Sequence, residues 1–291
     1  MPHCIHESGS FGGAAGEDVG HGCPVSEPIR VCDPAHPALE PYTGIRERDL
    51  VGRLGLFIAE GEVVVRVLAL HCPLRIRSLL LEERRVAAMQ DVLGALPDRV
   101  AVYVVAQALM DVVVGFAIHR GVLALGDRSP AVDPSVLASG TDGPLVGLVG
   151  LTNHDNVGGI FRNAAAFGAR VLLDEATCDP LYRKAIRVSA GAALTVPFAR
   201  CASAEAMVDA MRAARVEPIA LTPSSDETLM RLPPGRYGLL LGTEGSGLPE
   251  SVMARARRVR IDMVPGFDSL NVAVASGIAL YEATRKRPPG T

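Results

Sequence analysis

Three polar segments of this chain combine residues that can bind a ligand or assist a reaction. The first spans residues 153–164, NHDNVGGIFRNA, and opens a helical pattern after an apolar run. Side chains on a helix lean toward its N-terminus, so we expect Arg162 to project over Gly158, whose missing side chain leaves space for the arginine stem. The Arg162 guanidinium would then reach the end of the preceding strand; an ordinary surface arginine is the alternative. Asp155 or Asn156 is expected to cap the helix.

The second segment spans residues 239–249, LLLGTEGSGLP, a strand pattern that runs into a glycine-rich loop. Its three glycines permit close approach of the backbone to a ligand. The spacing GxxGxG differs from the dinucleotide fingerprint GxGxxG, and the loop lacks the Lys-Ser/Thr pair of a phosphate loop, so these two types of nucleotide site are disfavoured. Glu244 is either a solvated acid near the start of a helix or a polar group directed at a site.

The third segment spans residues 261–272, IDMVPGFDSLNV, and leads into the last helix. Ser269 is expected to cap that helix, where free backbone amides can hold a carboxylate or a carbonyl group. Apolar residues then recur at helical spacing and predict either a core face or an interface face. These residues are Leu270, Val274, Ile278 and Tyr281.

A parallel sheet is predicted to position the three segments. Apolar runs alternate with helical patterns in units of strand followed by helix, which is typical of a mostly parallel sheet with both faces covered. Ligands of such sheets bind at the carboxyl ends of the strands, where the three segments begin. The strand candidates are residues 145–151, 169–173, 218–221, 238–241 and 259–263.

The 291 residues divide into a predicted extension, two domains and a linker. Residues 1–40 are rich in Gly, Pro, His and Ser without a period, so we expect a poorly ordered extension. Residues 41–126 predict a small α/β domain, with an amphipathic stretch after Gly61, strands at 76–81 and 100–105 and a helix at 82–93. A Gly/Pro/Ser-rich linker is expected at 127–143, followed by the second domain at 144–287.

Composition narrows the class of protein. Apolar residues make up 48% and charged residues 21% of the chain, as in a globular protein. The net charge of −3 gives no overall positive field, so contact with nucleic acid would require local basic clusters. The six cysteines form no CxxC pair and no secretory leader is visible, which favours a reducing cytoplasm.

We expect neither a membrane span nor a metal site. The apolar stretch 100–118 is interrupted by Gln107 and Asp111, and two short buried elements explain it better than a transmembrane helix. The histidines and cysteines near the N-terminus match no standard zinc spacing. They are His3, Cys4, His6, His21 and Cys23.

Together, and in this order, the three segments resemble the signature motifs of the SpoU/TrmH family of RNA ribose 2'-O-methyltransferases, in the SPOUT superfamily. The resemblance covers roughly residues 145–287 and includes residues 189–192, SAGA, which look like the family's central segment. The preceding domain, ending in residues 115–124, GFAIHRGVLA, is similar to the ribosomal-protein-type RNA binder of many members. The pattern alone predicts a Rossmann-like sheet, because knots are rare. The resemblance implies instead a C-terminal trefoil-knotted methyltransferase domain with a smaller N-terminal α/β substrate-binding domain.

The resemblance also implies roles for particular residues. S-adenosyl-L-methionine would sit bent in the knot of an obligate homodimer. Asp262 departs from the pattern, since many members carry proline there, which affects the backbone expected around the cofactor. The positions linked to catalysis and RNA contact are Asn156, Arg162, Glu244, Ser269 and Asn271. Those that contact the cofactor are Gly242, Ile261 and Leu270, with Leu221 and Thr222 as further candidates.

The implied activity is transfer of a methyl group from S-adenosylmethionine to a ribose 2'-hydroxyl of structured RNA, ribosomal or transfer. The alternatives are an inactive RNA-binding or assembly protein that kept the fold, and an enzyme with a different cofactor. Because arginine stays protonated, we expect Arg162 to fix the hydroxyl or its phosphate, with action as a general base as the second option. Candidate RNA contacts are Arg75, Arg77, Arg84, Arg85, Arg183, Lys184, Arg187 and the stretch 255–260.

Overall fold

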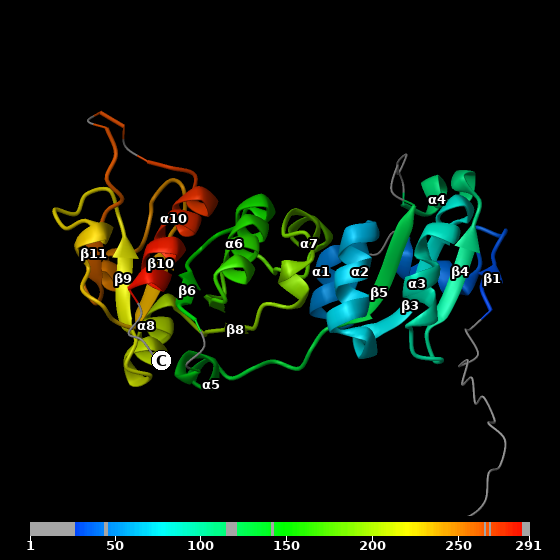
Figure 1. The fold of residues 1–291 in the computed structure, drawn as a ribbon, viewed down its shortest axis with the longest axis horizontal. Helices are drawn as coiled ribbons and strands as arrows, with labels where there is room; N and C mark the ends of the chain where they lie inside the picture. The colour runs from blue at the N-terminus through cyan, green and yellow to red at the C-terminus, as the bar shows by residue number, and fades with distance from the viewer. Residues whose placement is uncertain are drawn as a thin grey trace, which may run out of the picture.

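The computed structural model describes residues 27–43, 46–114, 121–140, 143–264, 266–267 and 269–286. Within these ranges the strands form two sheets, one of five strands and one of six, at opposite ends of an elongated molecule (Figure 1). Helix α7 (Arg183–Val188) lies between them. The protein is therefore of the α/β class, as predicted.

The five-stranded sheet is mixed and has the order β1-β4-β3-β5-β2. β5 is antiparallel to both of its neighbours, whereas β4 is parallel to β3 and β1. The strands are β1 (Ile29–Arg30), β2 (Leu56–Glu60), β3 (Ile76–Glu82), β4 (Ala101–Val105) and β5 (Val122–Asp127). The helices around them are α1 (Glu47–Gly52), α2 (Glu62–His71), α3 (Gln90–Gly94) and α4 (Gln107–Val114), with 3-10 turns at Pro37–Tyr42, Pro73–Arg75, Glu83–Arg85 and Ala87–Met89.

Two predicted strands and the amphipathic helix after Gly61 are confirmed as β3, β4 and α2, but the predicted helix at 82–93 is wrong over its first half. The Glu82 amide donates to the Gly121 carbonyl at 2.8 Å, and Glu82 pairs with Val105, so the sheet continues to the end of β3. Only short 3-10 turns and α3 follow. Cross-strand pairing thus overrides local helix propensity.

The six-stranded sheet has the order β11-β9-β10-β6-β7-β8, and all its pairs are parallel, as predicted. Successive side chains face opposite sides. Val146 and Leu148 pack toward α6 and α10, whereas Leu145 packs toward α8. The strands are β6 (Leu145–Leu148), β7 (Arg170–Leu173), β8 (Phe198–Arg200), β9 (Glu217–Leu221), β10 (Tyr237–Leu241) and β11 (Arg257–Val259). The remaining helices are α5 (Pro134–Ser139), α6 (His154–Ala166), α8 (Ala204–Ala213), α9 (Glu250–Met253) and α10 (Val272–Arg285), with 3-10 turns at Ala192–Leu194 and Leu229–Arg231.

The strand predictions differ from the structure at their ends. The strand expected at 145–151 ends at Leu148, and the one expected at 259–263 ends at Val259. Beyond Val259 the chain pairs with a loop instead of β9, since the Arg260 amide donates to the Glu227 carbonyl at 2.8 Å. The three-residue strand β8 was not predicted, because three residues are too few to show a period.

The stretch expected to be a linker contains a helix. Asp133 caps α5 by accepting from the Ser135 amide at 2.8 Å, and Leu137 and Ala138 are buried in the same cluster as α8. The buried Arg170 side chain of β7 also donates to the Leu137 carbonyl. Residues 134–139 therefore pack as part of the six-stranded sheet's covering layer.

Several contacts join the two ends of the molecule through the region of α7. The Arg183 amide donates to the Glu47 carboxylate at 2.7 Å, and Arg75 donates to the Leu194 carbonyl at 2.9 Å. Arg128, just after β5, pairs with Asp179 at 2.7 Å. The two sheets and their helices are therefore in direct contact around α7.

The apolar stretch near residue 100 forms β4 and α4, as predicted, and no helix in the described ranges is long and apolar enough to cross a membrane. The same ranges contain no cluster of three or more His, Cys, Asp or Glu residues suited to a metal ion. The histidines and cysteines at positions 3–23 lie outside the described residues.

Candidate functional site

Helix α6 begins two or three residues earlier than the predicted caps imply. The Asn153 side chain caps it by accepting from the Asp155 amide at 2.9 Å. Asp155 and Asn156 were expected as caps, but both lie inside the first turn. As a result Asn156 is buried on the side of α6 that faces the rest of the site.

The paired glycines of the first segment let α6 pack against two helices. A Cβ atom on Gly158 would lie 2.7 Å from the Ala185 carbonyl oxygen of α7, and one on Gly159 would lie 2.8 Å from the Ala273 Cβ of α10. The space beside Gly158 is thus occupied by α7, and the expectation that it accommodates the stem of Arg162 is wrong. Arg162 itself is exposed.

Polar residues from the three segments meet in one hydrogen-bonded network. The Asn156 side-chain amide donates to Glu244 Oε1 at 2.7 Å. The Asn271 amide donates to the same oxygen at 3.1 Å and to Asn156 Oδ1 at 2.9 Å. The segments lie far apart in the chain, so this convergence supports the prediction that they form one site.

Asn271 has a second role at the start of α10. Its Oδ1 accepts from the amides of Ala273 and Val274 at 2.9 and 3.3 Å, which makes Asn271 the cap of the helix. Ser269 was expected in that position and lies two residues too early. The side chain that holds Glu244 is therefore itself fixed by the helix end.

A cavity of about 650 Å³ opens beside this network, at the carboxyl ends of β9 and β10. All five cofactor candidates line it, namely Gly242, Ile261, Leu270, Leu221 and Thr222. Glu244, Ser269 and Asn271 also line it, so the cavity and the polar network share a border. Neither Arg162 nor Ser269 makes a hydrogen bond or ion pair with the network within the described ranges.

Asn163 joins α6 to α10, a role that was not predicted from the sequence. Its side-chain amide donates to the Ala273 carbonyl at 2.7 Å and to the buried Ser276 hydroxyl at 2.9 Å. Asn163 follows Asn156 by seven residues, or two helical turns, so both amides lie on one side of α6. That spacing was the signal available in the sequence.

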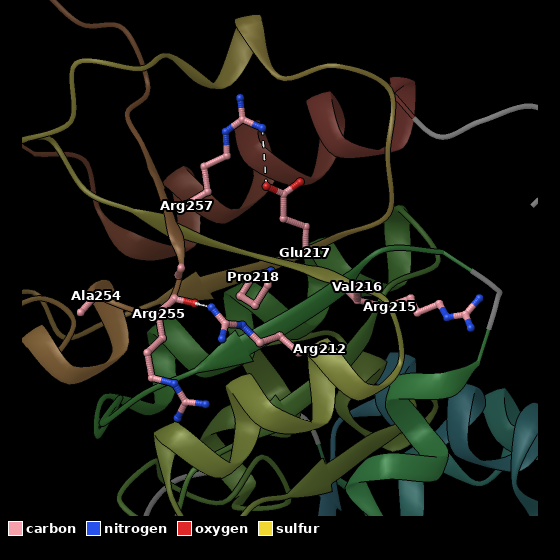
Figure 2. A pocket seen from close by; sticks show the side chains of 9 residues that line it. Arg212, Arg215, Val216, Glu217, Pro218, Ala254, Arg255 and Arg257 are labelled. Atoms are coloured by element: carbon pink, nitrogen blue, oxygen red, sulfur yellow. Dashed lines mark hydrogen bonds and ion pairs between the residues drawn. The ribbon is translucent and has the colours of Figure 1, made fainter.

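A second cavity, of about 460 Å³, lies at the opposite edge of the six-stranded sheet (Figure 2). Arg212 donates to the Arg255 carbonyl at 2.6 Å, and Arg257 pairs with Glu217 at 3.5 Å and with Glu227. The C-terminal ends of α8 and α9 meet here, and arginines compensate the partial negative charge of such ends. Because Arg215 points away from the other arginines (Figure 2), the arginines of this cavity do not converge on one point. We therefore assign them to holding the neighbouring helices and strands together.

Most arginines proposed as RNA contacts have carboxylate partners. Arg77 pairs with Asp127, Arg84 with Glu82, Arg187 with Glu60, Arg255 with Asp209, Arg258 with Glu250 and Arg260 with Asp262; Lys184 pairs with Asp155. Arg75 instead packs over the Phe57 ring and bonds backbone carbonyls. Local pairing lowers the net positive charge that these clusters present to a phosphate.

A parallel sheet with a cavity at its carboxyl edge is the arrangement in which α/β proteins bind small molecules. Residues 144–281 match the model of the SpoU rRNA methylase family. An uncharacterized tRNA/rRNA methyltransferase of Mycobacterium tuberculosis is 38% identical over 269 residues, which cover 88% of this chain and 91% of that protein. The chain belongs to the SpoU rRNA methylase family.

Two further proteins extend the comparison. The 23S rRNA (guanosine-2'-O-)-methyltransferase RlmB of Salmonella typhi is 31% identical over 178 residues, covering 59% of this chain and 73% of that protein. The crystal structure of the SpoU methyltransferase AviRb from Streptomyces viridochromogenes, in complex with the cofactor AdoMet, is 25% identical and has a TM-score of 0.72. The match covers 86% of this chain and 98% of the AviRb chain, so the similarity includes both sheets.

Proposed function

We propose that this protein transfers a methyl group from S-adenosylmethionine to a ribose 2'-hydroxyl of structured RNA. The observation that carries the proposal is the meeting of Asn156, Glu244 and Asn271 at the border of the cavity. Membership of the SpoU family and the 2'-O-methyltransferase RlmB among its relatives support the reaction type. We place the activity in the cytoplasm, where ribosomal and transfer RNA would be available as substrate.

The cavity has the size and chemistry to hold S-adenosylmethionine. Its volume is within the range of roughly 300–1,000 Å³ typical of small-molecule sites. Apolar side chains such as Leu241 and Ile261 can enclose the adenine ring, while the hydroxyl groups of Thr222 and Ser224 are available to polar parts of the molecule. A Cβ atom on Gly245 would meet nothing within 4 Å, so the loop leaves its backbone accessible. When bound, the cofactor would supply an electrophilic methyl group.

The polar residues beside the cavity can orient an RNA ribose. Two amide groups hold Glu244 Oε1, which leaves Oε2 able to accept a hydrogen bond from a substrate hydroxyl. Arg162 is exposed on α6 and carries a forked guanidinium, so we assign it to binding the hydroxyl or an adjacent phosphate. Orientation of reacting groups is itself a large part of catalysis for a direct displacement.

The proposal includes features implied by the family resemblance. These are a homodimer, a trefoil knot in the second domain, and a first domain that binds the RNA. We keep the division at residues 41–126 and 144–287 as part of the proposal but assign α5 to the second domain, because Leu137 and Ala138 pack with α8.

The test combines binding with transfer. Full-length protein is titrated with S-adenosylmethionine by calorimetry and then incubated with methyl-tritiated cofactor and ribosomal or transfer RNA from cells lacking the gene. We expect binding, and label in nucleotides that resist alkaline cleavage, because a 2'-O-methyl group removes the attacking hydroxyl. Cofactor and RNA binding without label would favour the inactive RNA-binding protein. Failure to bind the cofactor would favour a different cofactor enzyme.

A further inference from the structure

One wall of the cofactor cavity is built from two neighbouring segments, residues 222–228 and 257–263. The first contributes Thr222 and Ser224 to the lining, and the second contributes Ile261. Neither stretch lies entirely in a regular strand or helix. The shape of this wall therefore depends on the contacts between the two segments.

Backbone hydrogen bonds join the segments beyond the end of the sheet. The Thr222 amide donates to the Val259 carbonyl at 2.9 Å. The Arg260 amide then donates to the Glu227 carbonyl, and the Leu229 amide donates to the Arg260 carbonyl, each at 2.8 Å. Arg260 is thus the residue at which the chain changes its pairing partner from β9 to the loop.

The side chains of the second segment alternate between the cavity and the outside. Ile261 and Met263 line the cavity, and Asp262 between them is exposed. On the outer side, Arg260 Nε lies 3.3 Å from Asp262 Oδ1, while Arg260 Nη1 donates to the Ser225 carbonyl at 2.6 Å. A planar guanidinium can hold two partners in this way because its donors form a fork.

Two further contacts restrain the same loop. The Ser225 hydroxyl donates to the Arg258 carbonyl at 2.8 Å. Arg257 forms a two-pronged pair with Glu227 and holds the pKa of that carboxyl below its usual value. The loop is therefore fixed near both of its ends, and the Arg260 side chain holds the part closest to Ser224.

We propose that Arg260 and Asp262 are positioning residues for S-adenosylmethionine. Together they hold the loop at Ser225 against the chain that follows β11, and so fix the cavity wall. This inference rests on the proposed function, because it takes the cavity to be the cofactor site. Arg260 acts through the Ser225 carbonyl, and Asp262 acts by orienting the Arg260 guanidinium. Neither residue is required to touch the cofactor.

The two residues should differ in their effect on affinity. Loss of one backbone-directed hydrogen bond in Arg260→Met should raise the Kd for S-adenosylmethionine about fivefold. Asp262→Asn should raise it only about twofold, since the Arg260–Asp262 pair is partly exposed. Arg260→Lys should fall between wild type and Arg260→Met, because a compact ammonium cannot serve both partners.

Arg66→Met provides a matched control. Arg66 also joins carboxylates, Glu62 and Asp91, to a backbone carbonyl, that of Ala88 at 2.6 Å, but it lies on α2 beside the other sheet. It should lose a similar amount of stability toward denaturant without any change in cofactor affinity. The comparison separates a local effect on the cavity from general destabilisation.

The experiment measures the Kd for S-adenosylmethionine by calorimetry at low and high salt, and the KM for the cofactor and kcat at saturation, for full-length wild type and the four variants. We expect higher Kd and KM with nearly unchanged kcat for the Arg260 and Asp262 variants. The difference between wild type and Asp262→Asn should shrink at high salt. Wild-type affinity in Arg260→Met and Asp262→Asn would overturn the inference alone, whereas wild-type protein that does not bind the cofactor would overturn the proposed function.

Discussion

Glu244 is exposed, yet its carboxylate has a fixed orientation. Asn156 from α6 and Asn271 from the start of α10 both donate to the same carboxylate oxygen. Each asparagine is restrained in turn, the first by burial and the second by capping α10. A carboxylate held in this way by two amides is suited to orient a hydroxyl or a guanidinium of a ligand.

Arg162 is also exposed but, unlike Glu244, it has no polar partner within the described ranges. We expect Arg162→Ala to lower methyl transfer at least a hundredfold while cofactor affinity stays within about twofold, because Arg162 does not line the cavity. Arg162→Lys should also lose most activity, since a point charge cannot reproduce a forked donor. Single-turnover assays together with calorimetry test both variants. A near-normal rate in either would show that the arginine is an ordinary surface residue.

Among the elements, most strands of the six-stranded sheet were predicted but their ends were not, whereas β1, β2 and β5 of the five-stranded sheet were not predicted. β7, β9 and β10 coincide with runs of apolar residues, so their positions and lengths are visible in the sequence. The ends of β3 and β11 depend instead on partners distant in the chain, Gly121 for β3 and Glu227 after β11. The predictions of the helix caps were wrong for a related reason. Several cap-forming residues lie close together at the start of each helix, and only the packed structure selects Asn153 and Asn271.

The candidate site shows the same division. The three segments and their residue types were visible, and the cavity includes all five positions expected to contact the cofactor. The role of Gly158 was misassigned, because the sequence does not show that α7 occupies its open side. The contacts of Asn163 and Arg260 were not predicted, since each depends on a partner at least 35 residues away.

Substitution at the paired glycines tests the packing of α6. A Cβ atom in Gly158→Ala would lie 2.7 Å from the Ala185 carbonyl oxygen, a backbone atom that cannot move aside cheaply. We expect overpacking to lower the free energy of unfolding by about 1–3 kcal/mol. Up to about 1 kcal/mol of this loss should be regained, because alanine has a higher helix propensity than glycine. Denaturant unfolding gives the difference.

The control for Gly158→Ala is Gly52→Ala in α1. A Cβ atom on Gly52 would meet nothing within 4 Å, so this variant should be as stable as wild type or slightly more stable. Equal stability of Gly158→Ala and Gly52→Ala would mean that α6 and α7 are packed more loosely than the contact implies.

At the scale of the whole molecule, α10 presents an apolar face to solvent. The exposed fractions of Val274, Ile278 and Tyr281 are 53%, 39% and 52%. The sequence pattern predicted either a core face or an interface face, and the core face is wrong for these three residues. An exposed apolar stripe is consistent with an interface. We therefore expect Ile278→Glu to convert a dimer into a monomer and to abolish methyl transfer. Light scattering of wild type and variant decides the question, and an active wild-type monomer would refute the dimer.

The division of labour between the two ends of the molecule can be tested by truncation, but the boundary matters. The composition of residues 127–143 predicts that a chain beginning at residue 141 would keep the second domain intact. Such a chain loses α5, exposes the surface covered by Leu137 and Ala138, and removes the carbonyl that the buried Arg170 side chain bonds. A chain beginning at residue 129 keeps α5, its packing against α8 and the hydrogen bond from Arg170 to the Leu137 carbonyl. We therefore expect the longer fragment to be more stable toward denaturant by several kcal/mol.

Both fragments lose the partners that the first domain supplies to the region of α7. Glu47 and Arg75 no longer bond the Arg183 amide and the Leu194 carbonyl, so even the longer fragment should be less stable than the full chain. The cofactor cavity is formed by residues 221–275 and should survive in it. Recognition of structured RNA needs a larger surface than one ribose pocket, so RNA affinity should fall and its dependence on salt should weaken. Calorimetry with S-adenosylmethionine and RNA binding at two salt concentrations measure these effects. RNA affinity and salt dependence equal to those of the full chain would show that the first domain does not hold the substrate.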